Sequence, residues 1–159
     1  MHDILEIHAL GEAHDWPALF NQLRYWSKGG GDGRQDEVVR MISRYPKETV
    51  PLLKKELGQF SVPPDLMYEA LGLTGTSDAV AALKNKAKKE ENIWSAMSLV
   101  HALSVAGKPG QKALKELDKI ATHNLRIAID KYKSGELQEQ YEKVRFPPIP
   151  SKLALPRDI

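Results

Sequence analysis

Two acid–histidine pairs near the start of the chain are the first candidates for chemistry. Glu6 and His8, and Glu12 and His14, repeat the same two-residue spacing six residues apart. With a further carboxylate such histidines could hold a metal ion, but the spacing differs from that of the zinc-protease helix motif. His8 and His101 each precede an Ala-Leu pair, which favours a packing role for both. We therefore predict no metal site and no cofactor.

No other residues form a recognisable catalytic pattern. The chain has no cysteine, which removes disulfides, thiolate catalysis and cysteine metal sites, and it has no Gly-x-Ser-x-Gly nucleophile motif. The glycine-rich stretch 28–33 could present backbone amides to a phosphate, but it follows an expected helix and no Gly-Lys-Ser/Thr comes after it. We interpret it as a linker, and we predict no catalytic residue and no enzymatic activity.

Lysines gather in every second expected helix. Lys84 and Lys88 lie four residues apart, and lysines 112, 115 and 119 are separated by three and four, so each set shares one helical face. Such faces would attract an acidic protein surface or a phosphate backbone. The alternative is that the lysines only solvate the polar sides of amphipathic helices. The predicted partner-binding residues are Lys54, Lys84, Lys88, Lys112, Lys115 and Lys119.

The three tryptophans are candidates for interface anchors, because exposed tryptophan often serves that purpose. Trp26 lies in an apolar stripe and is expected in the core. Trp16 stands at a helix start and Trp94 follows two glutamates and an asparagine, so both are candidates for partial exposure. Packing between helices is the preferred interpretation for all three.

The elements that position these residues are all expected to be helices. Apolar residues recur at helical spacing along most of the chain, and no run shows the alternation of a strand. Turns at 45–46, 72–78 and 105–110 contain proline or glycine. Ser77 or Asp78 is expected to cap the helix that follows the second of these turns, and Ile120 is expected in an inward-facing stripe.

A short apolar motif recurs in the first helix of each expected pair of helices. Its marker residues, Leu10, Ile42, Leu71 and Leu103, are separated by 32, 29 and 32 residues. A nearly constant period of this size is typical of a helical-repeat solenoid. We therefore predict an all-α superhelix of four to five hairpins, with residues 1–145 as a single domain and 146–159 as a proline-rich tail.

The sequence Glu-Ala-Leu-Gly-Leu-Thr-Gly-Thr-Ser-Asp-Ala-Val-Ala-Ala-Leu at 69–83 resembles a HEAT-like repeat, and segments 8–23 and 100–117 echo it. In that family Ala-Leu-Gly closes the first helix and Ala-Val-x-x-Leu opens the second. The resemblance implies a right-handed stack whose second helices line the concave face, where partners are held. We expect Gly11 and Gly72 to end their helices, because glycine permits a positive φ.

Composition bounds the class of protein. A chain of 159 residues with 42% hydrophobic and 28% charged residues fits one folded domain. No apolar run approaches the roughly 20 residues that span a bilayer, and the N-terminus lacks the pattern of a secretion signal, so we expect a cytoplasmic protein without a membrane partner. The net charge is +2, yet residues 1–37 carry seven acidic and three basic side chains, so the positive excess lies further along.

Three functions are compatible with these features. The preferred hypothesis is a protein-binding module, such as an adaptor, inhibitor, regulatory partner or toxin-immunity protein, which holds a partner with an acidic surface on its concave face. The second is a nucleic-acid-binding protein related in style to the HEAT-like alkylpurine DNA glycosylases, which the small net charge disfavours. The third is an enzyme resembling the HEAT-like bilin lyases, for which no catalytic residue can be placed.

Overall fold

The computed structural model describes residues 4–26, 34–57 and 64–144, and these form ten α-helices and no strand. The all-helical class predicted from the sequence is confirmed. No helix in these segments combines the length and apolar character needed to cross a membrane. The helices are α1 (Ile4–Glu12), α2 (Trp16–Trp26), α3 (Arg34–Ser43), α4 (Pro46–Glu56), α5 (Pro64–Thr74), α6 (Ser77–Lys88), α7 (Ile93–Ser104), α8 (Gly107–Ile120), α9 (His123–Lys133) and α10 (Glu136–Val144).

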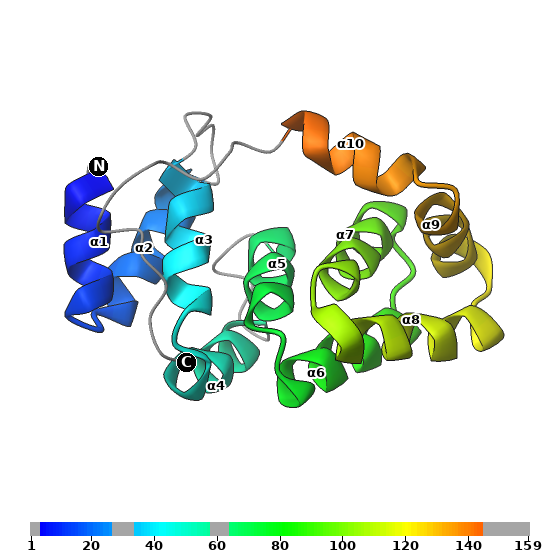
Figure 1. Ribbon diagram of the computed structural model, residues 1–159, viewed down its shortest axis with the longest axis horizontal. Coiled ribbons are helices and arrows are strands. Elements are labelled where there is room, and N and C mark those ends of the chain that lie inside the picture. The colour runs from blue at the N-terminus through cyan, green and yellow to red at the C-terminus, as the bar shows by residue number, and fades with distance from the viewer. Residues whose placement is uncertain (1–3, 27–33, 58–63, 145–159) are drawn as a thin grey trace.

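The helices are arranged in two rows. Each helix contacts the next along the chain, and α1, α3, α5, α7 and α9 also contact one another in that order; these five helices are named the first row. The second row consists of α2, α4, α6 and α8, of which the last three contact one another in order. Helix α10 packs on α7 and α9, on the side away from α6 and α8 (Figure 1).

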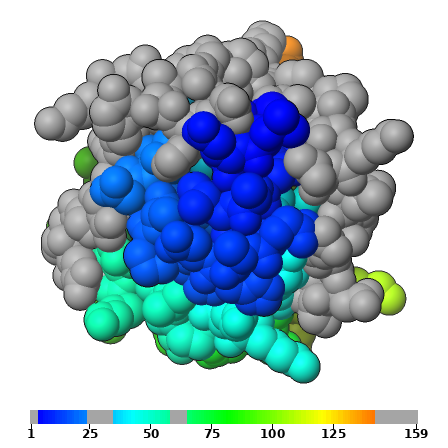
Figure 2. Space-filling model, turned by 90° about the vertical axis from the view of Figure 1, so that its left-hand side faces the viewer, coloured from blue at the N-terminus to red at the C-terminus, as the bar shows by residue number. Residues whose placement is uncertain are grey.

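Helices α1 and α2 form one end of the molecule, where parts of α3 and α4 also reach the surface (Figure 2). Beneath this surface the side chains of His8 and Glu37 are both fully buried, with His8 Nε2 3.4 Å from Glu37 Oε2. Arg40 Nη1 donates to Glu37 Oε1 at 2.7 Å. The carboxylate of Glu37 on α3 therefore contacts α1 through His8. The burial of His8 agrees with the packing role expected from its position before Ala-Leu.

His14, the histidine of the second acid–histidine pair, also contacts residues distant in the sequence. His14 lies beside the rings of Trp16 and Tyr45, with ring centroids 5.3 and 4.6 Å away, and its Nδ1 is 2.5 Å from a carboxylate oxygen of Glu48. Trp16 is only 6% exposed, in agreement with the packing interpretation. Among the described residues, no three His, Cys, Asp or Glu side chains gather as a metal site would require.

Helix α7 occupies the middle of the helical core. It contacts α5, α6, α8, α9 and α10, and seven of its residues are buried, with no charged residue among its twelve. A helix surrounded on all sides must be apolar on all sides. His101 on this helix stacks on the ring of Tyr141 in α10, with centroids 3.9 Å apart and planes 6° from parallel, so it packs against the last helix.

Two glycines lie inside helices where neighbouring backbones nearly touch. A Cβ placed on Gly72 in α5 would lie 2.3 Å from the carbonyl oxygen of Ala102 in α7. A Cβ on Gly110 in α8 would lie 1.9 Å from the carbonyl oxygen of Leu103. Both positions therefore allow an approach of helices that any side chain would prevent.

The expectation that Gly11 and Gly72 end their helices is wrong, because α1 and α5 continue past them. The positive φ that follows α1 belongs to His14 (56°), and the one that follows α5 belongs to Gly75 (65°). Glycine in the repeated motif thus serves close packing, while the positive φ at the chain reversal occurs three residues later.

Side-chain caps fix the beginnings of two central helices. Thr76 caps α6 by accepting a hydrogen bond from the backbone N–H of Ala79, so the expectation of a Ser77 or Asp78 cap is wrong by one or two residues. Asn92 caps α7, and its Oδ1 accepts from the N–H groups of Trp94 and Ser95 at 2.9 and 3.1 Å.

Asn92→Ala is expected to lower the free energy of unfolding by about 1 kcal/mol, because two N–H groups at the start of α7 lose their acceptor. Urea denaturation measures the change. Asn85→Ala is the matched control, since Asn85 is exposed in the middle of α6 and caps nothing. Equal effects of the two substitutions would contradict the capping role of Asn92.

Candidate partner-binding surface

The two rows of helices differ in the sign of their charge. The second row contains eleven basic and five acidic side chains. The first row contains five basic and seven acidic side chains. The second row is therefore positively charged and the first row negatively charged, although the net charge of the chain is small. An acidic partner would be attracted to the second row.

All six lysines predicted to bind a partner lie on the second row. Lys54 is on α4, Lys84 and Lys88 are on α6, and the remaining three are on α8. The fold thus brings together residues that are up to 65 positions apart in the sequence, from 54 to 119. The six divide into two groups with different surroundings.

Lys54 and Lys84 join neighbouring second-row helices. Lys54 Nζ on α4 donates to Asp78 Oδ1 on α6 at 3.0 Å, and Lys84 on α6 pairs with Glu116 on α8. These two lysines therefore have carboxylates of the fold as partners, which is neither free solvation nor an unoccupied binding group. Exposed pairs of this kind contribute little stability, of the order of 0–1 kcal/mol each.

The other four lysines are exposed and form no ion pair with any residue of the described segments. Those on α8 follow the spacing three, four along one face, opposite the stripe of Ala113, Leu114 and Leu117 that is buried. This group, named the free-lysine face, consists of Lys88, Lys112, Lys115 and Lys119.

Asp118, one of the two acids of α8, is paired with residues of α9, and the other, Glu116, is paired with Lys84. Arg126 and Lys133 both donate to the carboxylate of Asp118, and these hydrogen bonds hold the pKa of Asp118 below its ordinary value, the one from Arg126 contributing most. Arg126 also donates to the main-chain carbonyl of Asp118 at 2.8 Å, near the end of α8. Because Asp118 is paired in this way, it leaves the α8 lysines without a local counter-charge.

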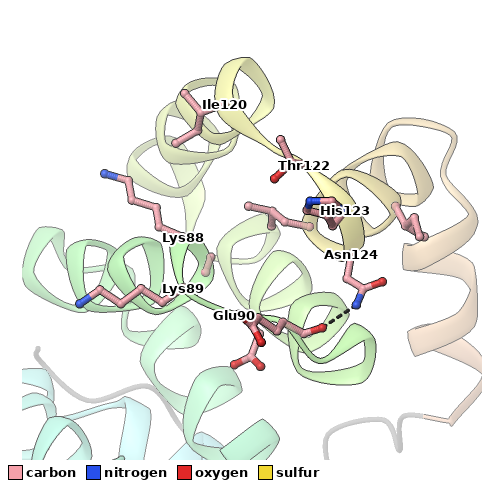
Figure 3. A pocket seen from close by; sticks show the side chains of 11 residues that line it. Lys88, Lys89, Glu90, Ile120, Thr122, His123 and Asn124 are labelled. Carbon is pink, nitrogen blue, oxygen red and sulfur yellow. Dashed lines mark hydrogen bonds between the residues drawn. The ribbon is translucent and has the colours of Figure 1, made fainter.

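An open hollow lies where α6 and α8 end and α9 begins. Its volume is about 740 Å³, and Lys88 and Lys89 stand on one rim with Thr122, His123 and Asn124 across from them (Figure 3). Asn124 Nδ2 donates to the carbonyl oxygen of Glu91, which ties α9 to the connection between α6 and α7.

The hollow also exposes apolar surface. Ile120 and Ile127 both line it and are 56% and 46% exposed, so the expectation that Ile120 faces inward is wrong. Helix α8 ends at Ile120, where no neighbouring helix remains to cover it. The free-lysine face and this hollow share Lys88, and the lining of the hollow also includes the carboxylates of Glu90 and Glu91.

The sequence analysis missed the hollow because its lining comes from three separate helix ends. It also assigned Trp94 to packing, whereas that side chain is 68% exposed. The position of each residue near a helix end was a signal of exposure. Ile120 is the last residue of α8, and Trp94 is the second residue of α7. The glycine-rich stretch 28–33, the Trp26 side chain and the tail 146–159 lie outside the described residues.

Comparison with known proteins gives one short similarity. No family model matches the chain, and no solved structure matches it. A segment of 54 residues, 33% of the chain, is 44% identical to part of "Serine/threonine-protein kinase UL13" of Suid herpesvirus 1 (strain NIA-3). The matched segment spans 14% of the length of that kinase. The chain therefore shares one local stretch of sequence with this kinase.

Proposed function

We propose that the chain is a protein-binding module built from HEAT-like hairpins in a right-handed superhelix, and that its second row holds a partner with an acidic surface. The observation that supports this most directly is the free-lysine face, whose four exposed lysines form no ion pair within the described segments and one of which, Lys88, lines a hollow with two exposed isoleucines. Protein interfaces commonly combine apolar anchors with a charged rim.

The division of the lysines refines the proposed contact. Lys54 and Lys84 are paired within the fold, so the partner would meet Lys88 and the three lysines of α8. An acidic segment running along α8 could place an apolar side chain into the hollow against Ile120 and Ile127. The charges would chiefly raise the association rate, and the apolar contact would slow dissociation.

Nucleic acid is the second candidate partner, because the same lysines could neutralise phosphates. The acidic first row and the net charge of +2 weigh against it. Phosphoryl transfer is not proposed from the kinase similarity. Protein kinases use a lysine on a strand and a glycine-rich loop over the phosphates, whereas the described segments contain helices and no strand.

The test compares two double charge reversals of equal net change. Lys88→Glu with Lys119→Glu alters the free-lysine face, and Lys47→Glu with Lys55→Glu alters exposed lysines on α4 of the same row. A partner recovered from native extract with the tagged chain is expected to bind the first variant at least about tenfold more weakly, because steering and local charge contacts are lost. The second variant is expected to bind nearly as well as the unaltered chain.

Binding of the purified partner is measured by surface plasmon resonance at two salt concentrations, after treatment with nuclease. Equal weakening by both variants would show that only overall charge matters and would contradict the assignment of the face. Loss of the partner on nuclease treatment would replace the protein-binding proposal by the nucleic-acid alternative.

A further inference from the structure

A second hollow lies between α5, α7 and α10. It has a volume of about 310 Å³, within the range of pockets that hold small groups. Its lining includes three aromatic residues, Tyr68, Trp94 and Tyr141, together with the carboxylate of Asp65. Among the residues that the structure describes, no lysine, arginine or histidine belongs to the lining. The proposed function uses none of these residues.

Two of the aromatic walls are held in place by the fold. Tyr68 is 2% exposed. Tyr141 is fixed by the ring of His101, on which it stacks, and by a hydrogen bond of 2.9 Å between its hydroxyl and Ser98 Oγ. A ligand would therefore meet prearranged ring surfaces, which lowers the entropic cost of binding.

The third aromatic residue is exposed without a partner to cover it. Trp94 is 68% exposed at the second position of α7, and the Asn92 cap fixes the backbone from which it projects. Asp65 is exposed on α5 and forms no ion pair with a residue of the described segments. The pocket thus offers an indole surface and an unpaired carboxylate from two different helices.

The surrounding electrostatics are negative. Burial raises the pKa of Tyr68 to about 12, with further contributions from the charges of Glu90 and Asp65. Burial also raises the pKa of Tyr141, and the charges of Asp65 and Glu69 add to this effect while the hydrogen bond with Ser98 opposes it. Both phenols remain neutral at physiological pH, so the carboxylates set the potential in the pocket.

Aromatic faces and a carboxylate together recognise organic cations. A guanidinium group stacks on tryptophan and forms paired hydrogen bonds to a carboxylate, and it is more weakly hydrated than an ammonium group. We propose that the α5–α7–α10 pocket binds an arginine side chain of a partner protein, with the guanidinium against Trp94 and its N–H groups directed to Asp65. The chain would then have a second docking site, one that selects a cationic group, in addition to the proposed lysine contact.

The test titrates the full chain with capped tripeptides and follows the indole N–H signal of Trp94 by NMR. Gly-Arg-Gly is the probe, Gly-citrulline-Gly is its neutral isostere, and Gly-Lys-Gly carries the same charge without the planar group. A saturable shift with the arginine peptide, at least about tenfold weaker with citrulline, is expected from the loss of cation–π and ionic contacts. A lysine peptide that binds as tightly as the arginine peptide would overturn the guanidinium assignment.

Two exposed substitutions and one control make the result specific. Asp65→Asn is expected to weaken binding of the arginine peptide about tenfold by removing the carboxylate charge, and Trp94→Leu is expected to weaken it to a similar degree. Glu12→Gln removes an exposed carboxylate on α1 at the other end of the molecule and should leave the affinity unchanged. Equal affinities for Asp65→Asn and the unaltered chain, or binding that fails to saturate, would overturn the proposal.

Discussion

Gly110→Ala is expected to lower the free energy of unfolding by more than about 3 kcal/mol, at the upper end of the range for overpacked sites. The new Cβ would lie 1.9 Å from the carbonyl oxygen of Leu103. The obstacle is main chain of α7, which cannot rotate away as a side-chain end can. Helices α7 and α8 would have to separate, and α7 contacts four further helices. Gly72→Ala, with 2.3 Å to the carbonyl oxygen of Ala102, should act in the same way between α5 and α7.

Urea denaturation followed by circular dichroism measures these losses, and an unchanged m-value would show that the folded state remains compact. Gly107→Ala is the matched control. Gly107 has a φ of 73° and no atom within 4 Å of an added Cβ, so its substitution tests backbone strain alone and should cost about 1–2 kcal/mol. A loss at Gly110 no larger than that at Gly107 would contradict the close approach of the helices.

Glu37→Leu is expected to destabilise the fold by about 4 kcal/mol, the size found when one partner of a buried ion pair is removed. The carboxylate is fully buried and lies between Arg40 and His8. Without it, the guanidinium of Arg40, whose side chain is 15% exposed, would lose its hydrogen bond to Glu37 Oε1 in a region largely shielded from water. The contact between α1 and α3 would weaken at the same time.

The chain offers a matched control at its surface. Glu48 also pairs with a histidine, His14, but the two side chains are 48% and 43% exposed. Glu48→Leu should therefore cost less than about 1 kcal/mol. Thermal and urea denaturation of both variants give the comparison, and a loss for Glu37→Leu as small as that for Glu48→Leu would mean that the buried group is not an essential partner of Arg40.

The periodicity of apolar residues was sufficient to predict that the chain is all-helical. Spacing determines which face of a helix is apolar, and Leu71, Leu83 and Leu103 are all fully buried. It does not determine what lies opposite that face. Gly72 was therefore assigned to a helix end, because its role as a contact point depends on Ala102 of another helix, 30 residues further on.

The candidate site was predicted only in part, for a similar reason. The sequence placed six lysines on helices of one kind, and the structure puts all of them on the second row. Pairing of Lys54 with Asp78 and of Lys84 with Glu116 spans 24 and 32 residues. Which residues pair depends on how far one hairpin is shifted along the next. The amphipathic pattern alone does not specify this shift. Exposure of Ile120 and Trp94 depends likewise on where the neighbouring helices stop.

Contacts between nearest helices have a consequence for how the chain acquires its structure. The extensive contacts between described helices join elements no more than three places apart in chain order, the longest being α7 with α10. Little loop-closure entropy opposes such short-range pairing, so folding should be fast and should not wait for distant segments to meet. Loss of structure can begin at either end, and α7, which has the most neighbours, should exchange its amide hydrogens last.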